Sequence, residues 1–371
     1  MYFLVLFYIK ILTSPKKILI IIQRSNGDVF LSISLIAALY DYYEEPQIDL
    51  LVNDDTLAVA KLLPHINFIH TFSYQKKRDR RWNQEKKIIS NIYRKYDLSI
   101  NLTASDRSVI YALLAGKKSI SAIEETSYKS WWKKLILSHF YFFNTNKHIA
   151  LNNLEPLNIL AIENKEIQDF VISARAMNKV KKMLNKMQID KFIIFHPSAQ
   201  YDFKIYPKHL RNKLLMYLNT LGVPILITGT NNKVDLKIND DLPDLKNIHN
   251  FIGKTSIEEY CALSSLSLSY IGMDTLNMHI PAVQNKRIFA IFGPTNLKMW
   301  APWSNDLKTY NFESSPVHNY GRITIFQSYL PCVPCGNAGC NNKNRSECLF
   351  TIWPEDIFSQ IKKWYINETL S

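Results

Sequence analysis

The segment Ser269-Tyr270-Ile271-Gly272-Met273-Asp274-Thr275-Leu276-Asn277-Met278-His279 indicates the fold class of this chain. An apolar run, Leu263 to Ile271, leads into it, and a second run, Arg287 to Phe292, follows it. This order predicts a buried strand, a turn, a helix and another buried strand. Asp274 fits the N-cap of that helix, and His279 projects from the same end of it. Open α/β sheets bind phosphate-bearing ligands at such strand-to-helix turns.

The rest of the chain alternates between apolar runs and amphipathic stretches, which predicts two successive βα series. In the first series we expect strands at Lys17–Ile22, Ile48–Val52 and Asp97–Leu102, with helices at Val29–Tyr43 and Ser105–Leu114. In the second series we expect strands at Phe192–Phe195, Val223–Thr228 and Ile288–Phe292, with helices at Pro207–Leu218 and Ile257–Leu266. The predicted fold is α/β, with two doubly wound, Rossmann-like domains facing each other across a cleft.

The length of 371 residues suits two domains, each with its own core. We expect an N-terminal domain over residues 1–165, a linker helix over 166–189, a C-terminal domain over 190–350, and a final helix over 351–371. An apolar fraction of 47% with 21% charged residues is typical of a globular protein and excludes a disordered one. No run of about 18 apolar residues is present, which argues against a transmembrane helix.

Basic residues are in excess, with 45 Lys and Arg against 32 Asp and Glu for a net charge of +13. Such an excess favours an anionic partner. Two clusters combine basic and aromatic residues, Lys76–Trp82 and Lys129–Lys134, the second containing Trp131-Trp132. Paired Trp beside Lys resembles a membrane-interface anchor, although a solvated basic face explains each cluster better when that cluster is taken alone. Residues 1–15 are apolar and aromatic, and either rest in a membrane interface or pack as an extra helix.

The turn after the first predicted strand is the second chemical site. It reads Gln23-Arg24-Ser25-Asn26-Gly27-Asp28, and its single glycine excludes a dinucleotide fingerprint. Asp28 stands at the mouth of the sheet, where a carboxylate can accept a proton from an incoming hydroxyl. The alternative is that Asp28 only caps the helix that begins at Val29.

A third site follows the first strand of the second series, at His196 to Pro207. Lys204 stands just before a helix start at Pro207, and a flexible lysine there can reach a diphosphate, the alternative being an ordinary surface lysine. Along the same edge we expect further polar contacts to a ribose or base from Ser198, Thr228, Gly229 and Asn231.

Together these sites resemble glycosyltransferase family 9, the ADP-heptose:lipopolysaccharide heptosyltransferases. The resemblance covers about residues 17 to 305, and its most specific part is the block from Asp274-Thr275-x-x-x-His279 to Phe292-Gly293-Pro294-Thr295. The other matching pieces, in the family's order, are Ser25-x-Gly27-Asp28, Tyr96–Leu102, Lys204-x-x-Pro207, Gly253–Ser256 and Trp300–Trp303.

The resemblance implies the GT-B fold and inverting transfer that needs no metal or other cofactor. It implies an acceptor site on the N-terminal domain and a nucleotide-sugar site on the C-terminal domain. Asp28 matches the family's proposed general base, and Lys204 and His279 match groups that contact the diphosphate. We expect substrate contacts from Ser25, Asn26, Gly27, Asp274, Thr275, Leu276, Asn277, Gly293 and Thr295 as well.

The sequence departs from the family pattern at two places. Leu276 stands where many members have glycine, which alters how closely the backbone approaches the phosphates. No acidic residue stands in register near Asn231 and Asn232 to hold the ribose, and Asp235 substitutes from one turn later. ADP remains the expected nucleotide.

Four cysteines form a separate constellation, Cys332-x2-Cys335-x4-Cys340-x7-Cys348. The first pair has the spacing of zinc-binding turns, so the four thiols are candidate ligands of a structural zinc or iron ion. Free thiols in a reducing cytoplasm, or disulfides in an exported protein, are the alternatives.

Two function classes fit the sequence. The first is a transferase that moves a heptose from an ADP-sugar donor to a lipid-linked, phosphorylated oligosaccharide, and that works in the cytoplasm, peripherally on the inner face of a bacterial inner membrane. The second is a basic protein that binds a membrane or nucleic acid and has a degenerate sugar-nucleotide fold. Polar residues at the strand ends, including Asp28, Lys204, Asp274 and His279, favour the transferase, which needs an anionic membrane surface but no nucleic acid.

Overall fold

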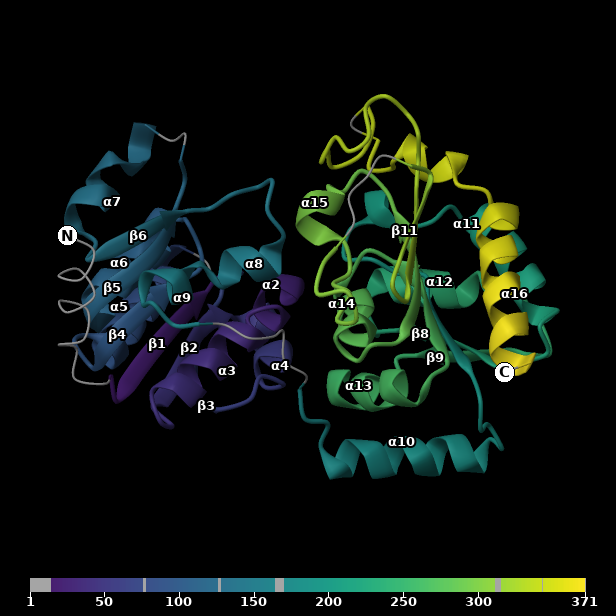
Figure 1. The fold of residues 1–371 in the computed structure, drawn as a ribbon, viewed down its shortest axis with the longest axis horizontal. Coiled ribbons are helices and arrows are strands. Elements are labelled where there is room, and N and C mark those ends of the chain that lie inside the picture. The colour runs from purple at the N-terminus through teal and green to yellow at the C-terminus, as the bar shows by residue number, and fades with distance from the viewer. Residues whose placement is uncertain are drawn as a thin grey trace. The chain divides into compact units, whose positions relative to one another are not determined.

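The computed structural model describes residues 15–75, 78–125, 128–163, 170–310, 315–341 and 343–370. The chain divides into two compact units, Met1–Val171 and Ile172–Ser371. Each unit contains one sheet with helices on its faces (Figure 1).

The first unit contains a six-stranded sheet in the order β3-β2-β1-β4-β5-β6, and all its neighbouring strands are parallel. The strands are β1 (Lys17–Ile22), β2 (Gln47–Asn53), β3 (Ile66–Phe72), β4 (Tyr96–Asn101), β5 (Gly116–Ile123) and β6 (His139–Phe142). The helices are α2 (Asn26–Phe30), α3 (Ile33–Tyr42), α4 (Leu57–Ala60), α5 (Arg78–Ile92), α6 (Asp106–Ala115), α7 (Trp131–Ile136), α8 (Ile149–Asn153) and α9 (Glu155–Ile159). Two short 3-10 helices are η1 (Asp54–Thr56) and η2 (Tyr128–Ser130).

The second unit contains a seven-stranded sheet in the order β12-β13-β11-β10-β7-β8-β9. Its parallel strands are β7 (Ile193–His196), β8 (Ile225–Gly229), β9 (Ile248–Ile252), β10 (Ser269–Met273), β11 (Arg287–Phe292) and β13 (Ile323–Gln327). The remaining strand, β12 (Val317–Tyr320), pairs antiparallel with β13. The helices are α10 (Ala174–Lys186), α11 (Lys208–Asn219), α12 (Lys233–Asp240), α13 (Ile257–Leu266), α14 (Leu276–Val283), α15 (Leu297–Trp300) and α16 (Pro354–Leu370), with the 3-10 helices η3 (Asp202–Lys204) and η4 (Glu347–Thr351).

Both sheets have the same strand order once β12 is set aside. Counted along the chain within each unit, the parallel strands lie in the doubly wound order 3-2-1-4-5-6. The order reverses between β1 and β4 in the first unit and between β7 and β10 in the second. Ligands of such sheets bind outside the carboxyl ends of the strands at this switch point, so these two places are where a site is expected.

The central strands are apolar on both faces because helices cover both faces of a parallel sheet. β1 buries its last five residues completely, and β10 is buried along its whole length. Gly272 in β10 is required for close packing against β7, since a Cβ there would lie 2.4 Å from the carbonyl oxygen of His196. The turns that follow these strands therefore start from a rigid base.

The sequence predicted the fold class, and two Rossmann-like sheets confirm it, but several elements differ from the prediction. The single helix expected at Val29–Tyr43 is two helices, α2 and α3, because the chain turns at Leu31 and Ser32. Within the segment 166–189, where a linker helix was expected, the structure has helix α10, which packs on α13 of the second unit. Residues 164–169 lie outside the described part of the chain. Strands β3, β5, β6, β9, β12 and β13 were not predicted.

Candidate active site

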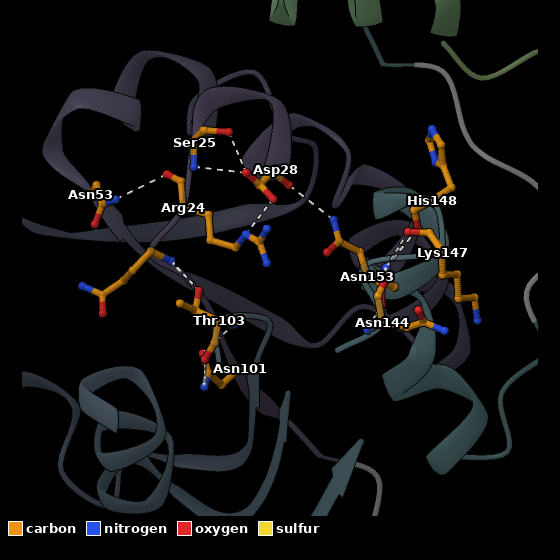
Figure 2. A network of polar contacts seen from close by, with 12 residues as sticks. Arg24, Ser25, Asp28, Asn53, Asn101, Thr103, Asn144, Lys147, His148 and Asn153 are labelled. Atoms are coloured by element: carbon orange, nitrogen blue, oxygen red, sulfur yellow. Dashed lines mark hydrogen bonds and ion pairs between the residues drawn. The ribbon is translucent and has the colours of Figure 1, made fainter. Parts of the chain in front are cut away.

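A buried carboxylate lies at the switch point of the first unit (Figure 2). Asp28 is in the first turn of α2 and is only 3% exposed. Its Oδ2 accepts hydrogen bonds from the backbone N and the Oγ of Ser25, at 3.2 and 2.6 Å. Its Oδ1 lies 2.7 Å from Nε of Arg24. The helix begins at Asn26 with Ser25 as N-cap, and not at Val29 as expected, and Asp28 forms a capping box with Ser25. The alternative that Asp28 serves to cap its helix therefore stands beside the predicted role as a base.

Neighbouring elements hold this turn in place. Asn53, at the end of β2, donates from Nδ2 to the carbonyl oxygen of Arg24 at 3.3 Å. Asn153, at the end of α8, donates from Nδ2 to the carbonyl oxygen of Asp28 at 3.3 Å. The backbone N of Gln23 donates to Oγ1 of Thr103, which follows β4, at 2.9 Å. Figure 2 shows these side chains converging on the turn from several segments of the unit.

Several buried polar atoms at this edge have no hydrogen-bond partner among the residues that the structure describes. They are both amide atoms of Gln23 and the Oδ1 atoms of Asn26 and Asn53. A buried polar group without a partner costs about 1–3 kcal/mol, so a cluster of them points to a polar ligand or water. Gln23 and Asn53 were not predicted as site residues, although Gln23 directly follows the buried strand β1 and Asn53 is the last residue of the buried strand β2.

In the second unit, Lys204 and Asp274 come together although 70 residues separate them in the sequence. Nζ of Lys204 lies 2.9 Å from Oδ2 of Asp274. Lys204 is the last residue of η3, after β7, and Asp274 directly follows β10, so the pair lies at the switch point of this sheet. The prediction that Asp274 is the N-cap of the helix is wrong, because Thr275 has the extended backbone of the N-cap and α14 begins at Leu276.

His279 lies in α14, is 2% exposed and faces the ring of Trp300 at a centroid distance of 6.4 Å. Burial lowers the pKa of His279 to about 4; nearby Asp274 opposes this shift and Lys204 adds to it. The ring is therefore neutral at neutral pH. Its buried Nδ1 has no partner in the described part of the chain. A neutral imidazole can still donate one N–H to a phosphate oxygen.

Three of the other predicted contacts at the edge of β7 and β8, Ser198, Thr228 and Gly229, hydrogen-bond to neighbouring residues of the second unit. Oγ1 of Thr228 lies 3.1 Å from Nδ1 of His196. Asp235 is buried and accepts from the hydroxyl of Ser198 and from the backbone N and the Oγ1 of Thr230. The carbonyl of Gly229 accepts from Gly253 N at 2.9 Å. Asp235 therefore orders the loop by internal hydrogen bonds to Ser198 and Thr230.

A second loop is held from inside the sheet. Nε2 of Gln327 donates to the carbonyls of Gly293 and Thr295 at 3.0 and 2.9 Å.

The remaining predicted contacts lie at the start of α14 and after β8. In α14 the carbonyl of Asn277 accepts from the Tyr260 hydroxyl at 2.6 Å. Asn231 is exposed, and Gly253 gives it room, since a Cβ at Gly253 would lie 1.8 Å from its Oδ1. The side chains of Leu276 and Asn277 are half-buried at the start of α14.

The four cysteines predicted as metal ligands do not form a ligand set. Cys332 is exposed, Cys335 and Cys340 are half-buried, and Cys348 is 3% exposed. Among the described residues no three His, Cys, Asp or Glu side chains gather in a way that could hold a metal ion. Burial raises the pKa of the Cys348 thiol to about 12, and the other three thiols add to this shift. The arrangement therefore does not fit a bound metal.

The fold and the two polar strand edges define a class of protein. In the first unit a buried carboxylate lies among amide side chains that have hydrogen-bonding atoms without a partner in the described chain. In the second unit a lysine lies near the N-terminus of a helix that carries a neutral imidazole. Carboxylates act as bases toward hydroxyls, and helix N-termini with lysine bind phosphates. This combination on two Rossmann-like units is that of a GT-B glycosyltransferase.

Comparison with known proteins agrees. Residues 86–330 match the model of glycosyltransferase family 9 (heptosyltransferase). The chain is 26% identical over 325 residues to lipopolysaccharide heptosyltransferase 3 of Escherichia coli (strain K12), covering 83% of this chain and 93% of that protein. It also resembles the crystal structure of a family 9 glycosyl transferase from Veillonella parvula, with TM-score 0.72, 15% identity and coverage of 95% and 97%. The ADP-heptose lps heptosyltransferase II of E. coli matches with TM-score 0.68, 15% identity and coverage of 95% and 99%.

The chain therefore belongs to glycosyltransferase family 9 and is a glycosyltransferase. The family expected from the sequence is confirmed. The roles of the individual site residues stay predictions.

Acidification should destabilise the second unit through its buried histidines. Burial lowers the pKa of both His196 and His279 to about 4, whereas an unfolded histidine titrates near its ordinary value of 6.5. Between pH 4 and 6.5 the unfolded state binds more protons, so stability rises with pH and is fully present above 6.5. When the pH is lowered from 7 to 5, the protonation of each histidine in the unfolded state should lower the free energy of unfolding by about 2 kcal/mol. Urea unfolding of His279→Gln should show a flatter pH dependence than the native chain, and equal slopes would contradict the assignment.

Proposed function

We propose that this chain transfers a heptose from ADP-heptose to the inner core of a lipopolysaccharide or lipooligosaccharide, with inversion at the anomeric carbon. The observation that carries the proposal is the pairing of Lys204 with Asp274 at the start of α14. A cation, a helix N-terminus and a neutral imidazole there suit a nucleotide diphosphate leaving group. The names of the related proteins supply the sugar and the acceptor class, since they are lipopolysaccharide heptosyltransferases and one is named for ADP-heptose.

In the proposed reaction an acceptor hydroxyl attacks the anomeric carbon of the heptose. A new C–O bond forms on one face while the bond to the diphosphate oxygen breaks on the other, and ADP leaves with the electron pair. Asp28 takes the hydroxyl proton on a carboxylate oxygen; Oδ2 is held by Ser25 and Oδ1 by Arg24 in this structure. Ser25 and Arg24 fix the orientation of this carboxylate. Such positioned proton transfer contributes about 10²–10⁴-fold.

Negative charge grows on the departing diphosphate, and the second unit offers three groups to stabilise it. Lys204 supplies a positive charge, the N-terminus of α14 at Thr275 supplies backbone N–H groups, and His279 supplies a neutral donor. Preorganised donors of this kind stabilise charge that develops during the reaction. No metal or other cofactor has a part in these steps. A structural zinc or iron ion at Cys332, Cys335, Cys340 and Cys348 stays a prediction of the sequence that the described side chains fit poorly.

The acceptor is proposed to bind beside Asp28 in the first unit. Gln23, Asn26 and Asn53 present unpaired amide atoms there, and amides hydrogen-bond well to sugar hydroxyls. A transferase of the same fold that uses another nucleotide sugar or acceptor is the alternative, because these groups recognise hydroxyls and not one particular sugar.

A panel of nucleotide sugars tests the proposal. The full chain is incubated with ADP-heptose, ADP-glucose or UDP-glucose and with heptose-deficient lipooligosaccharide, and nucleotide release and product mass are measured. The proposal requires ADP release and a mass gain of one heptose, and only with ADP-heptose. Transfer of another sugar would support the alternative, and absence of any transfer would leave the second function class, a binding protein.

We also propose that the protein works in the cytoplasm, bound peripherally to the inner face of the inner membrane. The segment 1–15, except Pro15, lies outside the described residues, as do the side chains of Lys76 to Arg80. Within the described chain no helix is long and apolar enough to cross a membrane. At the second cluster, Trp132 is half-buried, and Lys133 is buried and paired with Asp106 at 2.7 Å. These two side chains are therefore not free to enter a membrane, and we propose that the exposed face beside them docks instead.

That face consists of Tyr128, Trp131 and Leu135, which are 92%, 61% and 74% exposed. Trp131→Ala with Leu135→Ser should weaken binding to anionic vesicles about tenfold or more, because two large apolar side chains are lost from the interface. Co-sedimentation with phosphatidylglycerol vesicles at low and high salt measures this. Met216→Ser, an exposed apolar residue of α11, is the control and should not change binding. Unchanged binding of the double variant would show that this face does not dock.

A further inference from the structure

A cavity of about 450 Å³ lies in the second unit, apart from the Lys204–Asp274 pair. Its walls are the segment 202–207, the first turn of α11, the outer face of α12 and the segment 345–350. This volume is in the range of sites that hold small molecules or cofactors. None of the steps of sugar transfer uses it.

The cavity has an excess of positive charge. Five cationic side chains line it, Lys208, Arg211, Lys233, Lys237 and Arg345, against two acidic ones, Asp202 and Asp241. Asp241 is already paired with Lys208 at 2.6 Å. Lys233 and Lys237, one turn apart on α12, have no ion-pair partner among the described side chains. Arg345 is paired with Glu347 at 2.7 Å, so the cations of the cavity that lack an ion pair in the described chain are Arg211 and the two lysines of α12.

Arg211 is the most informative of these residues because it is only 2% exposed. Its Nε donates to Oδ1 of Asn212 at 3.1 Å and its Nη2 to the carbonyl oxygen of Asp241 at 3.5 Å. Both acceptors are neutral, and the carboxylate that interacts with Arg211 electrostatically is that of Asp241, which also pairs with Lys208. Lys208 and the buried Arg211 thus share one carboxylate, so this end of the cavity can accept a further anion.

The remaining walls are apolar. Ile205, Tyr206, Val234, Ile238 and Phe350 line the cavity between the cations. An anion alone would leave these walls without contacts, whereas a phosphorylated molecule with a planar ring fills both parts. We propose that this cavity is an accessory binding site for a nucleotide, which places its phosphates toward Arg211, Lys233 and Lys237 and its base against the apolar walls.

The site is connected to the donor site through η3. Asp202, the first residue of η3, lines the cavity, and Lys204, the last, pairs with Asp274. Occupancy of the cavity therefore orders the turn that carries Lys204 and changes the rate of sugar transfer. This consequence rests on the proposed function, but binding at the cavity does not.

Methyl NMR of the full chain tests the binding directly. Ile205 and Ile238 line the cavity and report on it, whereas Met273 and Met278 flank the turn that carries Asp274 and report on the donor site. ADP is expected to shift both sets of methyl signals, with two separate affinities. Pyrophosphate is expected to bind the cavity with an affinity at least about tenfold lower than that of ADP, as measured from the Ile205 and Ile238 signals, because it lacks the ring.

Paired variants separate the two sites. Lys233→Glu with Lys237→Glu should abolish the ADP response of Ile205 and Ile238 and keep that of Met273 and Met278, while Lys204→Ala should weaken only the response of the two methionines. Lys181→Glu with Lys182→Glu makes the same charge change on exposed α10 and should alter neither. The inference is overturned by the absence of isoleucine shifts at millimolar ADP, by shifts that survive the α12 variant, or by equal affinity for pyrophosphate and ADP. A chain with no transferase activity but with these isoleucine shifts would refute the proposed function and leave the accessory site standing.

Discussion

Replacing Asp28 by asparagine is expected to lower turnover by about 100-fold or more, the usual scale for a lost general base. Asparagine has the same shape and can still accept hydrogen bonds from Ser25, but it cannot take up a proton at neutral pH. Donor binding should stay nearly unchanged, because the proposed diphosphate contacts are all in the second unit. Steady-state kinetics with ADP-heptose and acceptor give turnover, and titration with ADP gives donor affinity.

Ser25→Ala is the matched control for this prediction. It removes the hydroxyl that donates to Asp28 at 2.6 Å and weakens the start of α2, at a cost of about 1 kcal/mol in stability, but it keeps the carboxylate. Its turnover should fall far less than that of Asp28→Asn. If Asp28→Asn keeps near-native turnover and loses only stability, the carboxylate serves the helix and the proposed base is wrong.

The two-sheet fold was predictable because the central strands are continuous apolar runs. β1 and β10 are buried on both faces, and their runs stand out in the sequence. The strands that were missed are mostly edge strands or follow the region where the apolar pattern fades. β3 is half-buried or exposed over its first four residues, β6 has only four residues, and β12 is a short antiparallel addition to β13. Such strands depend on their sheet neighbours more than on their own sequence.

The candidate site residues could be chosen from the sequence because they stand in segments that follow buried strands. Asp274 directly follows β10, Asp28 and His279 lie in the helices that come after β1 and β10, and Lys204 ends η3 after β7. The pairing of Lys204 with Asp274 also needed the parallel packing of β7 and β10. Asn153 was not predictable, because it reaches the turn of Asp28 from 125 residues away. The reverse error occurred at Trp132 and Lys133, where a local pattern looked like a surface but packs inside.

Replacing Lys204 by alanine is expected to weaken donor binding at least about tenfold and to lower turnover about 100-fold, because the lost cation stabilises the diphosphate more strongly as its charge grows. Asp274 makes the loss larger. Its side chain is 7% exposed, and without Lys204 it presents a buried, uncompensated carboxylate to an anionic ligand. The double variant Lys204→Ala with Asp274→Asn removes this repulsion and should bind ADP more tightly than Lys204→Ala alone.

A double-mutant cycle over Lys204 and Asp274, read by ADP affinity and by turnover, measures the coupling. Affinity should recover in part in the double variant while turnover does not, since no cation then stabilises the leaving group. Lys213→Ala is the control, a surface lysine that pairs with Glu355 and whose loss should affect neither quantity. Strict additivity of the two substitutions, or a Lys204→Ala enzyme with native donor affinity, would show that the Lys204–Asp274 pair only braces the turn after β10 and does not hold the diphosphate.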